Sequence, residues 1–182
     1  MASAASKAKP STSELKMSDR CLLTADELLR FCFAETQRWR EWLAGNQDLL
    51  DLPIDIAQAN TVRELILHIV AVDLRYAERL LGEKVTEYNE LPRSTLAELF
   101  STSDRAREKL QTFMRQASDA EWNEVLSFPT RSAGMLTSSK RKIFIHTLLH
   151  GMRHWAQLAT YLRQQGHKQP WAHDFLLSDV IR

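Results

Sequence analysis

Three histidines recur at four-residue intervals in one strongly helical stretch of this chain: His146, His150 and His154. At about 100° per residue, steps of four place the imidazoles on nearly the same side of a helix, about 6 Å apart along its axis. Two histidines at this spacing can bind one zinc or nickel ion through neutral imidazole nitrogens. The row therefore predicts a metal site.

A third ligand has to come from another segment, because two histidines do not complete such a site. His68 is the only histidine before residue 118. It lies between Leu65 and Val72 at the edge of an apolar stripe, where a buried imidazole is costly unless it has a partner. Alone, such a residue is more often a hydrogen-bonded core histidine. Beside a histidine row on another helix, a third metal ligand is the better interpretation.

Helix starts are marked in the same way three times along the chain. Thr24, Thr61 and Thr95 each stand three residues before a glutamate, which is the pattern of a capping box. Apolar residues follow at helical spacing, and Gly45 and Gly82 stand where the first two helices are expected to end. His68 falls within the second predicted helix.

The last long helix is expected to begin after Ser138 or Ser139 and to run to about Gln165, before Gly166. It is apolar on most sides, which predicts a central position with neighbours on several flanks. Because no convincing period-two strands occur, the predicted fold class is all-α: a four-helix bundle with a long crossover, residues 118–137, before the last helix. Residues 124–128 are expected to be briefly extended.

Length and charge restrict the class of protein. The 182 residues fit one domain, placed at residues 21–182 after an Ala/Ser-rich segment, residues 1–20, which is interpreted as a flexible tail. With 24 Lys and Arg against 23 Asp and Glu, the net charge gives no reason to expect nucleic acid or an anionic membrane as partner. No stretch has the ~18 apolar residues of a membrane span.

The two cysteines, Cys21 and Cys32, form no Cys-x-x-Cys pair. They therefore predict neither a disulfide framework nor a thiolate zinc site. We interpret them as ordinary thiols of a reducing compartment, and we expect the protein to be cytoplasmic.

The run His150-Gly-Met-Arg-His154-Trp-Ala-Gln157, with Pro170 and Asp174-Phe-Leu beyond it, resembles the closing helix of the DinB-like (DinB/YfiT) superfamily. The resemblance extends over about residues 22–178. It implies that His68, His150 and His154 are the metal ligands, and that Gln157 is the family's glutamine, which supports a ligand or packs beside it.

The chain departs from this family pattern at three places. Arg153 stands where members often have a second, adjacent histidine, and Ala156 stands where they often have glycine. His146 lies outside the implied triad. It is open to three interpretations: a supporting group, a fourth ligand or a pocket residue. A supporting or pocket role is favoured.

Three imidazoles leave open positions on an ion, as in catalytic rather than structural sites. The resemblance implies a metal-dependent transferase that uses a low-molecular-weight thiol, since relatives include such transferases and isomerases. The ion, zinc or nickel, would lower the pKa of the thiol and hold the thiolate ready for attack. Arg153 and Lys142, taken to lie near the same end of the helix, are candidates to meet carboxylates of the thiol, and Tyr161 is a candidate pocket residue.

Two other functions stay open. A metal-dependent hydrolase needs a carboxylate beside the ion, but the chain has no His-Glu-x-x-His motif. Asp73 and Glu64 are the candidate bases, and neither is placed securely beside His68, so no catalytic residue is named. The third function is a non-catalytic metal-binding or stress-response module. The expected partners are a small-molecule substrate and, through apolar helix faces, a second copy in a homodimer.

Overall fold

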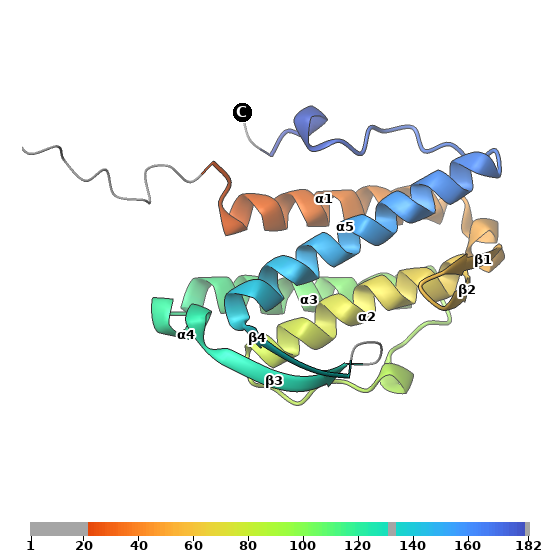
Figure 1. The fold of residues 1–182 in the computed structure, drawn as a ribbon. Coiled ribbons are helices and arrows are strands. Elements are labelled where there is room, and N and C mark those ends of the chain that lie inside the picture. Colours follow the sequence, from red (N-terminus) through yellow and green to blue (C-terminus); the bar gives the residue numbers. More distant parts are fainter. Residues whose placement is uncertain (1–21, 131–133, 181–182) are drawn as a thin grey trace, which may run out of the picture.

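The computed structural model describes residues 22–130 and 134–180. Its α-helices are four long ones and one short one: α1 (Ala25–Ala44), α2 (Val62–Leu80), α3 (Leu96–Gln116), α4 (Asp119–Asn123) and α5 (Lys140–Gln164). The prediction of a mostly helical chain is confirmed. Helix α2 packs against α3 and α5, and α1 packs against the same two helices, so the four long helices surround a common interior (Figure 1).

The helices start at the residues that the capping pattern indicates. The side chains of Thr24, Thr61, Thr95 and Ser139 each accept a hydrogen bond from the backbone N–H three residues further on. These bonds satisfy N–H groups that have no partner inside the helix. Of the two serines considered for the last helix, Ser139 is the cap. The start of α5 fixes the register of its histidines along the interior.

Among the described residues, two short antiparallel hairpins correct the all-α expectation, although the brief extension expected at residues 124–128 is present as part of β3. The first consists of β1 (Pro53–Ile56) and β2 (Ala59–Thr61), and the second of β3 (Val125–Thr130) and β4 (Gly134–Ser139). In the first, Ala57 and Gln58 form the turn with φ of 53° and 65°. Such turns usually contain glycine or asparagine, so the sequence signal was missing. The predicted crossover, residues 118–137, contains α4, β3 and most of β4.

The core joins α1, α2 and α5 through aromatic and aliphatic side chains. Trp39 of α1 stacks on Trp155 of α5 at 5.2 Å between ring centroids, and both are at most 1% exposed. After α5 the chain runs back along α1 (Figure 1). There the indole N–H of Trp171 donates to both carboxylate oxygens of the buried Glu35, and Nδ1 of His173 contacts Oε1 of the same carboxylate. These contacts hold α1, α5 and the C-terminal segment together.

In the described residues, two 3₁₀ helices lie between larger elements, η2 (Gln47–Asp51) and η3 (Tyr88–Glu90), and a third, η4 (Phe175–Leu177), follows α5. Within the part of the chain that the structure describes, no helix is long and apolar enough to cross a membrane. The predicted tail, residues 1–20, and Cys21 lie outside the described residues. Cys32 is buried.

Candidate metal centre

Three histidine rings from two helices converge between α2 and α5. His68 comes from α2, and His150 and His154 come from α5. The Nε2 atom of His150 lies 3.2 Å from Nε2 of His68 and 3.2 Å from Nε2 of His154. One ligand nitrogen from each of the three rings lies within 4.8 Å of the other two. This is the group of described residues that has the chemistry to bind an ion.

The spacing of these nitrogens fits a single divalent ion. Two nitrogens 3.2 Å apart could both reach one ion at metal–nitrogen distances of about 2.1 Å. Three such ligands occupy one side of an ion and leave the other side for water or substrate. The residues present therefore fit the predicted cofactor, a divalent metal ion whose identity the donor set does not decide.

The hydrogen bonds of His154 indicate which of its nitrogens faces the ion. Nδ1 lies 2.7 Å from Oε1 of Gln157, which can only accept, so Nδ1 carries the proton. On the other side, the guanidinium of Arg153 donates to Nε2 at 3.3 Å. Both contacts require a lone pair on Nε2. His154 is thus held in the tautomer that a metal ligand needs.

The electrostatic surroundings favour neutral imidazoles. Burial, followed by the neighbouring histidines and Arg153, lowers the pKa of His150 to about 3. Burial also lowers the pKa of His154, against the opposing effect of its hydrogen bond with Gln157. A neutral imidazole is the form that binds a metal. Within the described ranges Nδ1 of His150 has no hydrogen-bond partner, so this ring is oriented by packing and by its Nε2 contacts.

His146 lies beside the triad without joining it. Its exposed ring is 5.7 Å from the ring of His150 and 5.6 Å from that of Tyr76, between centroids. Burial, then Arg153 and Lys142, lowers its pKa. Lys142 and Arg153 are eleven residues apart on α5, about 16 Å along the axis. The expectation that these two cations lie near the same end of the helix is therefore wrong.

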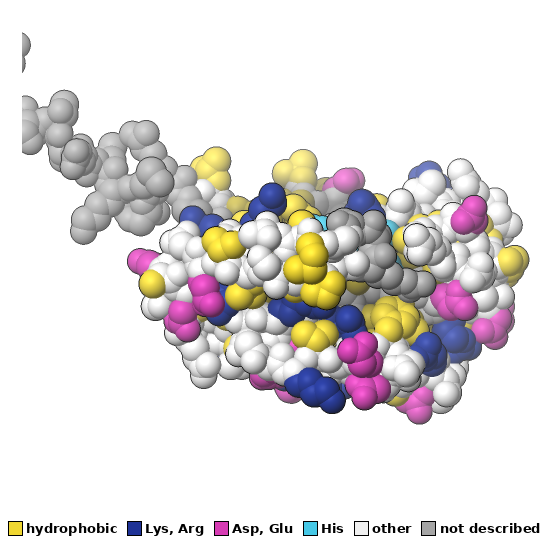
Figure 2. Space-filling model, turned by 60° about the horizontal axis from the view of Figure 1, so that its bottom comes forward, with side chains coloured by type: hydrophobic (Ala, Val, Ile, Leu, Met, Phe, Trp, Pro, Cys, Tyr) yellow, Lys and Arg dark blue, Asp and Glu magenta, His cyan; other side chains and the backbone are white. Residues whose placement is uncertain are grey.

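An open hollow of about 610 Å³ lies along α5, and two of its lining residues, Arg153 and Gln157, contact His154. Its lining contains the predicted pocket residues Arg153, Gln157 and Tyr161. The hydroxyl of Tyr161 donates to the backbone carbonyl of Pro53 at 2.5 Å, which ties the first hairpin to α5. Sequence reasoning missed the hairpin's contribution, Ile56, because no motif marks it. Histidine side chains also reach the surface on the face shown in Figure 2.

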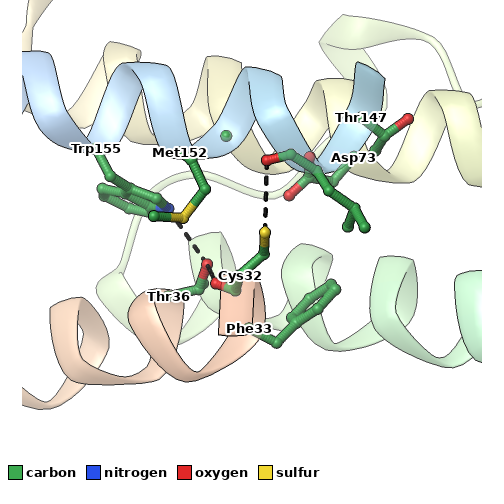
Figure 3. A pocket seen from close by; sticks show the side chains of 9 residues that line it. Cys32, Phe33, Thr36, Asp73, Thr147, Met152 and Trp155 are labelled. Carbon is green, nitrogen blue, oxygen red and sulfur yellow. Dashed lines mark hydrogen bonds between the residues drawn. The ribbon is translucent and has the colours of Figure 1, made fainter. Parts of the chain in front are cut away.

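The two carboxylates considered as bases lie elsewhere. Glu64 is exposed at the start of α2, where it accepts from the backbone N–H and side-chain amide of Asn60. Asp73 is 8% exposed and lines a cavity of about 10 Å³ between α1 and α5. Figure 3 shows this cavity with Cys32 and Thr36 facing Met152. Among the described residues, no carboxylate belongs to the histidine group.

The Gln157 contact has a measurable consequence. Replacing Gln157 by leucine removes the acceptor of the His154 Nδ1 proton while keeping a side chain of similar size. We expect the zinc affinity to fall about 10- to 100-fold, as for other groups that orient a ligand. Competition against a chromogenic chelator measures this. Gln164→Leu, in the same hollow but without a contact to His154, is the control, and an equal fall there would contradict the orienting role.

Comparison with known proteins gives one positive finding. The model of the DinB family matches residues 17–179 of the chain. A search of curated proteins found none that matches the chain.

Proposed function

The chain belongs to the DinB family, and from this we propose that it is a four-helix-bundle protein that binds a divalent metal and transfers a low-molecular-weight thiol to an electrophile. One observation carries the proposal: the Nε2 atoms of His68 and His154 each lie 3.2 Å from that of His150, with no fourth protein ligand among the described residues. An ion bound there keeps positions for an exogenous ligand.

A divalent ion in this site would lower the pKa of a bound thiol, so that the thiolate is present at neutral pH. In the proposed reaction the thiol proton goes to solvent and the sulfur forms a bond to an electrophilic carbon. The bond between that carbon and its leaving group breaks, and the leaving group departs with the bonding electron pair. The protein supplies orientation. Gln157 fixes the ring of His154, and the hollow beside it offers space for the remainder of the thiol.

The absence of a carboxylate from the described ligand group argues against the hydrolase. A hydrolase would need a base to take a proton from metal-bound water. Asp73 faces the internal cavity and Glu64 stands at the exposed start of α2. The non-catalytic module has the same ligand geometry and differs only in the absence of turnover.

A thiol panel tests the proposal directly. Zinc- and nickel-loaded protein is incubated with an aryl chloride and, in turn, several small thiols, and the loss of the electrophile is followed by absorbance. We expect turnover that requires both metal and thiol and that disappears in His68→Ala. Turnover without thiol would indicate the hydrolase. Stoichiometric metal without turnover in any combination would indicate the module.

The homodimer and the cytoplasmic location are also proposals. Exposed apolar side chains support a contact between copies. They include Ile145 and Leu149 on α5 and Met135 on β4. Analytical ultracentrifugation across a concentration series tests the dimer, and replacing Leu149 by lysine should weaken it. The net charge of +1 gives no electrostatic reason to propose nucleic acid or a membrane surface as a partner.

A further inference from the structure

Arg153 contacts the histidine triad and also lines the adjacent hollow. Its Nη2 atom donates to Nε2 of His154 at 3.3 Å. The same side chain borders the hollow, where it is exposed to solvent. A group that connects the two places can respond to what binds in either of them.

The hollow otherwise contains few groups that could bind an ion. Its lining residues are Ile56, Arg153, Ala156, Gln157, Thr160, Tyr161 and Gln164, which include one cation and no carboxylate. The hydroxyls of Thr160 and Tyr161 already donate to backbone carbonyls. Arg153 therefore supplies the positive charge and the planar donors that suit a carboxylate.

The contact between Arg153 and His154 conflicts with metal binding. A neutral imidazole has a single lone pair, which here lies on Nε2. The guanidinium and a metal ion cannot both use it. The contact also places the positive charge of Arg153 3.3 Å from Nε2 of His154. The same charge repels a divalent cation at the triad.

We propose that Arg153 is a specificity-determining residue that binds the carboxylate of an anionic thiol in the hollow, and that this anion and the metal ion at the triad strengthen each other's binding. Metal binding displaces Arg153 from His154 and leaves the guanidinium available in the hollow. An anion there neutralises the charge that opposes the metal. Coupling between two binding sites is reciprocal. The substrate class rests on the proposed function, whereas the coupling of anion and metal does not.

The coupling is tested with zinc and acetate. Zinc affinity is measured by chelator competition at constant ionic strength, with and without sodium acetate. Arg153→Ala should raise zinc affinity in the absence of acetate on the order of tenfold, because competition and repulsion are lost. Acetate should raise zinc affinity in the unmodified chain and not in this variant. Arg163→Ala removes an exposed cation of α5 outside the hollow and should behave like the unmodified chain.

The substrate class is tested with two thiols of similar size, 3-mercaptopropionate and 2-mercaptoethanol, titrated into zinc-loaded protein. The unmodified chain and Arg163→Ala should prefer the carboxylate, and Arg153→Ala should lose about tenfold of that preference. If the unmodified chain and both variants prefer 3-mercaptopropionate to the same degree, the inference is overturned. It is also overturned if Arg153→Ala does not raise the zinc affinity. If neither thiol binds, the proposed function fails, while the acetate measurement still decides the coupling.

Discussion

The unmodified chain is expected to bind about one equivalent of zinc or nickel, and replacing His68 or His150 by alanine is expected to abolish this binding. Each change removes one of three nitrogens that converge within 4.8 Å, and an ion with two imidazoles left has lost a large share of its binding free energy. We expect the zinc affinity to fall on the order of a hundredfold or more. Elemental analysis after dialysis and chelator competition measure it. Zinc should also raise the melting temperature of the unmodified chain and not of the variants.

His146→Ala is the matched control for this prediction. His146 lies one helical turn before His150 and contacts its ring, yet it contributes no nitrogen to the convergent group. Its removal should change zinc affinity by no more than a few-fold. Equal losses in His146→Ala and His150→Ala would show that the ligand set is wrong. Full zinc binding in both His68→Ala and His150→Ala would show that the ion, if any, binds elsewhere.

The local part of the fold was predictable because its signals lie within a few residues. Thr24, Thr61 and Thr95 are caps by side-chain chemistry alone, and their hydrogen bonds are present. The row on α5 follows from helical spacing in the same way. The hairpin β1–β2 was not predictable, because Ala57 and Gln58 adopt positive φ without the glycine or asparagine that usually marks such a turn.

The site illustrates the same limit. Helical spacing brings His150 and His154 together, but it cannot say which helix faces them. His68 was proposed because it is the only histidine before residue 118 and lies at the edge of an apolar stripe, and the family resemblance implied His150 and His154 as the other two ligands. That the three rings meet depends on how α2 and α5 pack. The contact of Arg153 with His154 depends on one side-chain conformation. The expectation that Arg153 and Lys142 lie near the same end of the helix was wrong, because eleven residues of α-helix separate them by about 16 Å along its axis.

The second large effect concerns the carboxyl group buried behind α5. Asp73 is 8% exposed, and its Oδ1 has no hydrogen-bond partner within residues 22–130 and 134–180. Burial raises its pKa to about 8. The cavity that it lines, about 10 Å³, is at the lower limit of the size that holds a single water molecule. The folded chain thus keeps this proton over a pH range in which the unfolded chain, with a pKa near 3.9, has lost it.

This difference in bound protons makes stability depend on pH. Between about pH 4 and pH 8 the folded state holds one more proton at Asp73 than the unfolded state, so the free energy of unfolding falls as the pH rises. In Asp73→Asn the group cannot ionise, and this contribution disappears. The free energy of unfolding of the variant, relative to that of the unmodified chain, should increase by at least about 2 kcal/mol from pH 5 to pH 8. Any fixed cost of the amide cancels in this comparison.

Urea denaturation of metal-free protein at pH 5 and pH 8 measures the effect. Thr147→Val is the control, because Thr147 lines the same cavity and carries no titrating group. Thr147→Val should alter the free energy of unfolding by a similar amount at both pH values, because the variant loses the hydrogen bond from the Thr147 hydroxyl to the carbonyl of Ile143. If Asp73→Asn shows no pH-dependent gain, the carboxyl is already ionised in the folded chain. Asp73 would then need a cationic partner in solution, since an unpaired buried carboxylate is too costly to persist.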